Sequence, residues 1–367
     1  MKKASRRPIA LLISAHNEEL LLGSTLRSAY SAGIPKCHIY VVDDNSSDAT
    51  ARIAKENVGR GNVVTVKRSG KAKALYLATK HFKIEKKYVW LHVADADSIF
   101  SKNYFRIMKR DLRSDKYCAA VGFVQSLKGN WISCYRTCLY SFGQEVNRRI
   151  QAIFHVIPVM PGPTSVYRTD ILKHLNFFAN SVTEDFDITL QIYRKNLGHI
   201  QFIPKAINYT QDPKNFYDYS KQILRWNKGF FQSIFNHKIG LHPRMIDVYL
   251  IYQIISAFLI LIQIAIVIPV ILLLTKKPQY LQTLVYAEAI SIVSMAFFGA
   301  VTTQRPYILR YTLFFYILKI ADFAIFIYAL FYVVITRILG LGKNGHVGWS
   351  TAGRRTKITK EMLASTT

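Results

Sequence analysis

This chain of 367 residues is poor in cysteine and in acidic side chains. Its four cysteines form no CxxC pair and have no histidine at zinc-ligand spacing, so the sequence indicates neither a disulfide framework nor a zinc site. Only 22 aspartates and glutamates accompany 49 lysines and arginines, which gives a net charge of +27. Such a charge favours partners that carry phosphate, namely nucleic acid, nucleotide-sugar diphosphates or anionic lipid headgroups.

The sequence also lacks the pattern of a secretory signal peptide. The basic start is followed by only six apolar residues before the chain turns polar at Ser14, which is too short for the apolar core of such a peptide. We therefore expect the chain to begin in the cytosol.

Charge is distributed unevenly along the sequence, with a break near residue 245, and residues 246–338 are expected to form a membrane region. Val248 to Leu274 holds 27 residues without a charged side chain, and about 20 apolar residues suffice to span a bilayer. Leu281 to Thr303 carries a single charge, Glu288. The sequence therefore predicts two spans, at about 246–275 and 281–303.

A third apolar stretch, at about 308–338, is interrupted by Lys319 and Asp322, and only 14 uncharged residues follow. This length fits an interfacial or re-entrant helix as well as a full crossing. The tail, residues 339–367, is basic, so the positive-inside rule places it in the cytosol. Because the start of the chain is expected in the cytosol as well, the number of membrane crossings must be even. We therefore favour two spans and an interface helix.

Residues 1–215 show the alternation of a parallel α/β domain. In such a sheet, ligands bind beyond the carboxyl ends of the strands, where polar clusters occur in this sequence. The short apolar runs that indicate its strands are Ile9–Ile13, Ile39–Val42, Val63–Val66 and Val89–Val93.

Aspartates follow two of these runs. Asp43 and Asp44 come after the second run, and Asp95 and Asp97 come after the fourth. An Asp-x-Asp pair can bind a hard divalent cation that completes its shell with phosphates, although aspartates at strand ends are also common without a metal. Lys71, which follows a glycine at a predicted helix start, fits either a diphosphate site or a solvated basic turn.

Three later motifs carry further candidate chemistry. Gly162-Pro163 forms a rigid loop before a strand, and Thr183-Glu184-Asp185 is either a helix start or a source of a catalytic carboxylate. Gln222-x-x-Arg225-Trp226 lies before the first span and offers an arginine for a diphosphate and a tryptophan for stacking on a sugar.

Two stretches, about 131–156 and 215–240, have apolar residues at helical spacing. They fit core-facing helices or helices in the membrane interface. We favour the interface because basic residues lie on or beside their polar faces. These residues are Arg136, Arg148, Arg149, Lys221 and Lys228.

Together and in this order, the motifs resemble those of the processive membrane polysaccharide synthases of glycosyltransferase family 2, the hyaluronan, chitin, cellulose and poly-N-acetylglucosamine synthases. The resemblance extends over roughly residues 8–355. It implies a cytosolic GT-A domain, Rossmann-like and nucleotide-sugar-binding, followed by interface helices and C-terminal transmembrane helices in the inner (plasma) membrane. The loop from Gly162 to Arg168 is most similar to the hyaluronan and chitin branch, whereas Thr183-Glu184-Asp185 is more similar to the cellulose and poly-N-acetylglucosamine branch.

The resemblance implies an inverting, metal-dependent transfer from a UDP-sugar. Asp185 would be the base, Glu184 would shape its environment, and Mg²⁺ or Mn²⁺ would bind at Asp95 and Asp97. In the tail, Trp349 and Arg354 resemble a segment that closes over the nucleotide, with a plain basic tail as the alternative. The residues implied to bind substrate are His16, Asn17, Glu18, Asp43, Asp44, Lys71, Asp95, Gly162, Pro163, Gln222, Arg225, Trp226, Trp349 and Arg354.

The product remains open at this stage. By resemblance, the first choice is the polymerisation of UDP-N-acetylglucosamine into a β-linked polysaccharide, which is then translocated. The alternative is the addition of one sugar to a lipid, because ceramide glucosyltransferases carry a similar Arg-Trp motif. The small number of spans favours this alternative, and a processive enzyme of this size would need homo-oligomer contacts. A nucleic-acid-binding protein would leave the ordered acidic motifs unexplained, so no nucleic-acid partner is expected.

Overall fold

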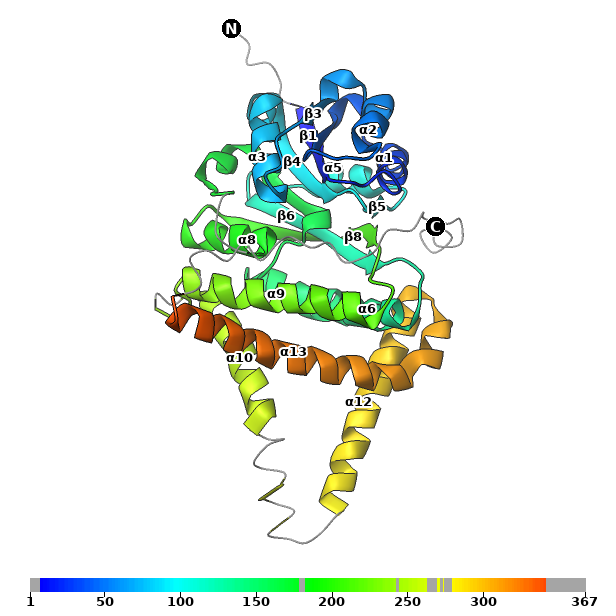
Figure 1. Cartoon of the computed structure of the whole chain (residues 1–367), viewed down its shortest axis with the longest axis vertical. Helices are drawn as coiled ribbons and strands as arrows, with labels where there is room; N and C mark the ends of the chain where they lie inside the picture. Colours follow the sequence, from blue (N-terminus) through cyan, green and yellow to red (C-terminus); the bar gives the residue numbers. More distant parts are fainter. Residues whose placement is uncertain are drawn as a thin grey trace.

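The computed structural model describes residues 7–177, 182–241, 244–262, 269–270, 273 and 279–340. The tail residues Trp349 and Arg354 therefore lie outside the described residues. A β-sheet with its helices lies above a layer of helices, and two further helices, α10 and α12, project from the opposite side of that layer (Figure 1).

The sheet has eight strands in the order β3-β2-β1-β4-β7-β6-β8-β5. The four predicted strands are confirmed as β1 to β4, and they are parallel. The sheet as a whole is mixed, because β7 runs antiparallel to both β4 and β6, and β5 runs antiparallel to β8. The strands are β1 (Arg7–Ala15), β2 (Ile39–Asp43), β3 (Val63–Thr65), β4 (Tyr88–Asp95), β5 (Ile99–Phe100), β6 (Tyr117–Ser126), β7 (Ser165–Arg168) and β8 (His199–Thr210).

Helices cover both faces of this sheet. Successive side chains of a strand point to opposite faces, so Leu12 of β1 packs on the α3 side while Leu11 and Ile13 pack on the side of α1, α2 and α5. The site is therefore left at the strand ends. The helices of this part are α1 (Leu22–Ser31), α2 (Thr50–Val58), α3 (Lys71–His81), α4 (Ile84–Lys87), α5 (Tyr104–Asp111) and α8 (Glu184–Arg194).

The helical layer consists of α6 (Trp131–Phe142), a π-helical turn (Gly143–Arg148), α7 (Arg149–Ile153), α9 (Phe216–Asn236) and α13 (Thr312–Ile338). Both amphipathic stretches are helical, and α13 runs beside α9 (Figure 1). Three of the basic residues expected on or beside the polar helix faces are buried instead, because the sheet and α13 cover these helices. Arg136 is 4%, Arg148 9% and Lys228 9% exposed. Arg149 and Lys221 are exposed as expected.

Polar contacts hold α13 on this layer. Asp322 accepts hydrogen bonds from the hydroxyls of Tyr135 in α6 (3.0 Å) and Tyr219 in α9 (2.6 Å). Lys319 pairs with Glu288 of α12 at 2.5 Å. The two charges that interrupt the third apolar stretch thus have partners in the protein.

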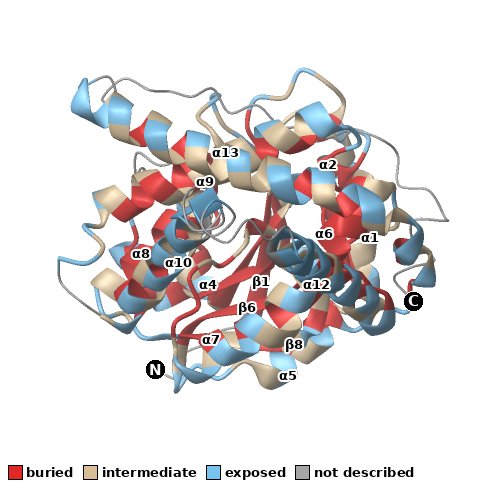
Figure 2. Ribbon diagram, turned by 90° about the horizontal axis from the view of Figure 1, so that it is seen from below, coloured by how far each residue is buried: buried red, intermediate tan, exposed pale blue. Residues whose placement is uncertain are grey.

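Two described helical segments, Leu281–Thr303 and Pro306–Ile338, are long and apolar enough to cross a membrane. The helix α12 spans Gln279–Thr303, and the shorter α10 spans Met245–Ile262. Most of the first predicted span beyond residue 262 lies outside the described residues. Apolar side chains of α10 and α12 are exposed (Figure 2), which is the kind of surface that an apolar solvent would cover. The number of crossings remains a prediction.

Candidate active site

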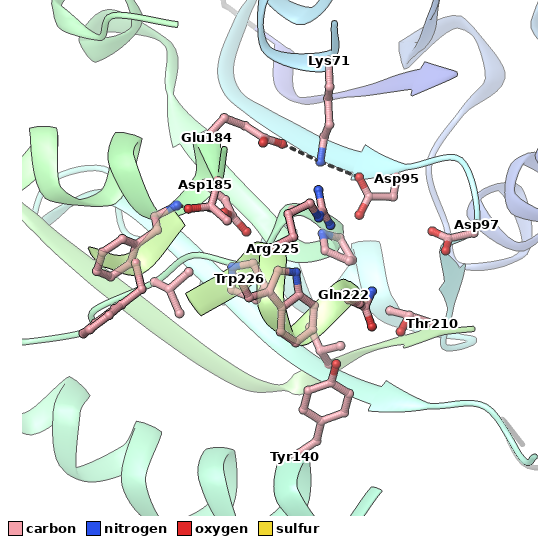
Figure 3. Close-up of a pocket in the computed structure, with 18 of the residues that line it drawn as sticks. Lys71, Asp95, Asp97, Tyr140, Glu184, Asp185, Thr210, Gln222, Arg225 and Trp226 are labelled. Atoms are coloured by element: carbon pink, nitrogen blue, oxygen red, sulfur yellow. Dashed lines mark hydrogen bonds and ion pairs between the residues drawn. The ribbon is translucent and has the colours of Figure 1, made fainter. Parts of the chain in front are cut away.

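The carboxyl ends of β1 and β4 and the starts of α3 and α8 surround a cavity of about 660 Å³, which residues of α6 and α9 also line. Figure 3 shows how Lys71, Asp95, Glu184 and Asp185 lie in it. The cavity brings together most of the side chains predicted to form the site. Those that line it are His16, Glu18, Asp44, Lys71, Asp95, Asp97, Gly162, Pro163, Glu184, Asp185, Gln222, Arg225 and Trp226.

Lys71 joins two acidic motifs that lie far apart in the sequence. Its Nζ lies 2.6 Å from Oδ1 of Asp95 and 3.0 Å from Oε1 of Glu184 (Figure 3). Burial alone would lower the pKa of Lys71, but the two carboxylates outweigh it and hold that pKa above its ordinary value. Gly162 lies against this pair, since a Cβ there would be 2.7 Å from the Lys71 Nζ. The lysine therefore stays protonated and fixes the end of β4 to the start of α8.

The motif Thr183-Glu184-Asp185 is both a helix start and a source of cavity carboxylates. Burial, and next the carboxylate of Glu184, raise the pKa of Asp185 to about 6. The more distant Asp187 lies 2.8 Å from Nε2 of His237 and is buried, so it does not line the cavity. Glu184 and Asp185 are thus the two acids of this motif that face the cavity.

Close contact between helices brings α9 to the same place. Gly229 of α9 lies so near Thr183 that a Cβ there would clash with the threonine hydroxyl, so glycine is required for α9 to lie on the start of α8. This approach brings Arg225 and Trp226 to the wall that Asp185 also lines.

Asp44 also lines the cavity, beside the loop that leads into Lys71. Its Oδ1 accepts from the backbone N–H of Ser69 at 2.7 Å, and its Oδ2 accepts from Gly70 N–H and from Arg68, each at 3.0 Å. Nδ1 of His16 lies 3.0 Å from the carbonyl oxygen of Asp44. The carboxylate therefore positions the loop that leads into Lys71.

Two of the predicted residues, Asn17 and Asp43, do not line the cavity. The N–H of Asn17 donates to Oγ of Ser46 at 2.9 Å, and Oδ1 of Asp43 accepts from the N–H of Ser46 at 3.1 Å. They hold the loop after β2 in shape, so their place is behind the cavity wall.

The donor set of Asp95 and Asp97 suits a hard divalent cation. Both carboxylates line the cavity, but the described residues contain no group of three or more histidine, cysteine, aspartate or glutamate side chains placed to hold a metal. Mg²⁺ commonly uses one or two protein carboxylates and takes its other ligands from water and substrate phosphates. The two aspartates therefore fit an ion that binds together with a phosphate-bearing substrate.

Arg136 is a functional candidate that was missed in the sequence. It is buried in an ion pair with Asp212 at 2.8 Å, and its Nη1 donates to Oε1 of Gln222 at 2.7 Å. Its guanidinium also lies 4.7 Å from the ring centroid of Trp226. One signal was available: Arg136 is the only charged residue in Trp131–Phe142. The arginine thus positions two members of the Gln-x-x-Arg-Trp motif.

Replacing Arg136 by methionine is expected to lower the activity of the site about tenfold or more, because Gln222 and Trp226 lose their support. Because Asp212 would stay buried but lose its ion pair with Arg136, the double variant Arg136→Met/Asp212→Asn should regain thermal stability without regaining activity. Arg149→Met is the matched control, and an equal loss there would contradict the assignment.

Comparison with known proteins identifies relatives over most of this chain. The model of the family described as "Glycosyltransferase like family 2" matches residues 6–229. A probable glycosyltransferase, YdaM, of Bacillus subtilis is 27% identical over 60% of this chain and 54% of its own length. Hyaluronan synthase of Streptococcus pyogenes is 26% identical over 70% of this chain and 65% of its own length. The chain thus spans between half and two thirds of these relatives.

Solved structures support the fold. The mannosyltransferase PcManGT from Pyrobaculum calidifontis, in complex with GDP-Man and Mn²⁺, superposes with a TM-score of 0.50 at 14% identity, covering 82% of this chain and 87% of that one. At this identity the likeness concerns the fold alone, which is the mixed α/β sheet of GT-A type.

Proposed function

Because this chain belongs to glycosyltransferase family 2, we propose that it transfers a sugar from a UDP-sugar to an acceptor hydroxyl, with inversion at the anomeric carbon. One observation carries the proposal: the acids at the end of β4, the acids at the start of α8 and the Gln-x-x-Arg-Trp motif of α9 line one cavity. Such a cavity can hold a diphosphate, a base and a sugar-stacking ring together.

Asp185 is proposed as the base. A sugar hydroxyl is a poor nucleophile, and a pKa of about 6 leaves this carboxylate ionised at neutral pH while it can still accept a proton. The hydroxyl oxygen forms a bond to the anomeric carbon, and its proton passes to Asp185. The bond from the anomeric carbon to the diphosphate oxygen breaks, and UDP leaves from the opposite face with the electron pair.

The other cavity residues are proposed to bind the two substrates. Arg225 and Lys71 supply positive charge for the leaving diphosphate. A divalent cation held by Asp95 and Asp97 would supply further charge there when bound. His16, Glu18 and Asp44 bind the uridine, with Asn17 and Asp43 behind them, and Gln222 and Trp226 bind the acceptor sugar beside Gly162 and Pro163.

We further propose that the enzyme is a multi-pass protein of the plasma membrane with its catalytic domain in the cytosol. N-acetylglucosamine is the proposed sugar, and the product is a β-linked polysaccharide that is then translocated. The helices α10, α12 and α13 are too few to enclose a polysaccharide, so this function requires a homo-oligomer. Transfer of one sugar to a lipid is the second candidate. It is favoured by the apolar side chains of Phe230, Ala257 and Phe326 in the cavity wall, because a lipid acceptor would pack against them.

The size of the product tests this choice. The full-length protein in nanodiscs is incubated with radiolabelled UDP-N-acetylglucosamine, and the products are separated by size before and after lipid extraction. A ladder or polymer supports the polysaccharide, and a single labelled glycolipid supports the second candidate. Absence of any labelled product, with every other UDP-sugar also inert, would contradict both.

The proposed base also predicts a pH dependence. Asp185 must be ionised to accept the proton, so turnover should fall as the pH drops through about 6 and level off above about 7. The profile is measured as kcat/KM against pH, with UDP affinity determined in parallel. A rate that stays constant between pH 5 and 7 would exclude a carboxylate of this pKa as the base.

A further inference from the structure

A buried arginine, Arg148, lines the cavity. Arg148 ends the π-helical turn and is only 9% exposed. Its Nη1 donates to the carbonyl oxygen of Val159 at 2.6 Å, whereas its Nε has no hydrogen-bond partner within the described part of the chain. Burial lowers the pKa of Arg148 to about 10, so the guanidinium is charged at neutral pH.

Two other arginines that are buried or partly buried have a carboxylate beside them. Arg136 pairs with Asp212, and Arg194 pairs with Asp247 at 2.9 Å. No aspartate or glutamate among the described residues forms an ion pair with Arg148. Burying a charge without a counter-charge is strongly unfavourable, so an anionic ligand in the cavity would offset a cost that the protein alone leaves uncompensated.

The surrounding contacts hold Arg148 in place. The Gln144 side chain binds the backbone of Val124, accepting from its N–H at 2.8 Å and donating to its carbonyl oxygen at 2.6 Å, which ties the π-helical turn to β6. Gln151 donates to the hydroxyl of Tyr249 in α10 at 2.6 Å. A π-helical turn changes which side chains face the neighbouring structure and is frequent at functional sites. These contacts hold the π-helical turn against β6 and α7 against α10, so the backbone that carries Arg148 is fixed on both sides.

Toward α10 the cavity is lined by apolar side chains and by Gln253 of α10. Val159, which accepts the hydrogen bond from Arg148, packs with Ile246 and Leu250 of α10. Further along, Ala257 of α10 and Phe326 of α13 line the same cavity. A ligand that reaches Arg148 from this side meets a cationic group and apolar walls, which suits an amphiphile with an anionic head.

We propose that Arg148 binds the phosphate of a membrane lipid that serves as the acceptor, with the lipid chain along α10 and α13. This inference rests on the proposed function and names its acceptor class. A hydroxyl of the lipid headgroup attacks the anomeric carbon, its proton passes to Asp185, and UDP leaves with the electron pair. The transfer places either a single sugar or the first sugar of a polysaccharide on the lipid.

Binding of radiolabelled dodecyl phosphate tests the inference. The full-length protein in dodecyl maltoside micelles is saturated with UDP, so that the diphosphate site is filled, and the Kd is then measured. Arg148→Gln is expected to weaken binding about tenfold or more, the loss expected for a charge-assisted hydrogen bond. Arg149→Gln is the matched control because this neighbouring arginine is 51% exposed and pairs with Glu145, and it should bind as wild type does.

The outcomes separate this inference from the proposed function. Failure of the wild type to bind UDP would count against the proposed function, whatever dodecyl phosphate does. If UDP binds, the lipid inference is wrong when Arg148→Gln binds dodecyl phosphate as tightly as wild type, when UDP displaces it, or when inorganic phosphate binds equally well. Arg148→Lys keeps the charge and should retain most of the binding, which excludes misfolding as the cause of the loss.

Discussion

Replacing Asp185 by asparagine is expected to lower kcat about 10²- to 10⁴-fold, the usual contribution of a positioned base. Asparagine has the same shape but cannot accept the hydroxyl proton at neutral pH. The affinity for UDP should stay near wild type, because the proposed uridine residues lie at the Asp44 end of the cavity. Turnover is measured as UDP release, and UDP affinity by calorimetry.

The control for this variant is Asp170→Asn. Asp170 carries a half-exposed carboxylate that pairs with Arg168, outside the residues that line the cavity, and its loss should leave turnover unchanged. Wild-type turnover in Asp185→Asn would remove Asp185 as the base. A parallel loss of UDP binding would instead indicate that the carboxylate supports the donor site.

Replacing Lys71 by methionine is expected to reduce turnover about a hundredfold or more. The variant loses two charge-assisted contacts, each worth about 1.5–3 kcal/mol, and leaves the carboxylates of Asp95 and Glu184 facing each other. The repulsion should move both acids away from their positions at the end of β4 and the start of α8. A lower Tm should accompany the loss, because removal of one partner leaves partly buried charge unpaired.

Lys80→Met is the control for this change. Lys80 lies on the same helix, α3, and forms an ion pair with Glu85, but its side chain is 47% exposed. Exposed pairs contribute little, so turnover and Tm should both stay near wild type. If Lys71→Met behaved in the same way, the bridge between the two acidic motifs would have no role in the site.

Local patterns predicted the parts of this fold that depend on neighbouring residues. Strands appear in the sequence as short apolar runs, so β1 to β4 were predictable, and so were the helices that contain Trp131 and Trp226. The antiparallel insertion of β7 between β4 and β6 was not, because pairing between distant strands leaves no local signal. The sequence order of β4 to β7 therefore differs from their order in the sheet.

The contacts between side chains of the site were also only partly predictable from the sequence. Sequence motifs named Asp95 and Glu184 separately, but only the folded chain shows that Lys71 lies between them. Arg136 and Arg148 were expected on polar helix faces, and burial gave them different surroundings. Long-range packing decides whether a basic residue on an amphipathic helix contacts solvent or a cavity.

The most direct test of the central claim is a screen of nucleotide sugars for UDP release by the purified full-length protein with Mg²⁺ or Mn²⁺. We predict that a UDP-sugar, with UDP-N-acetylglucosamine as first choice, is turned over by wild type and not by Asp185→Asn. Equal release by both proteins, or turnover of GDP-sugars alone, would contradict the account.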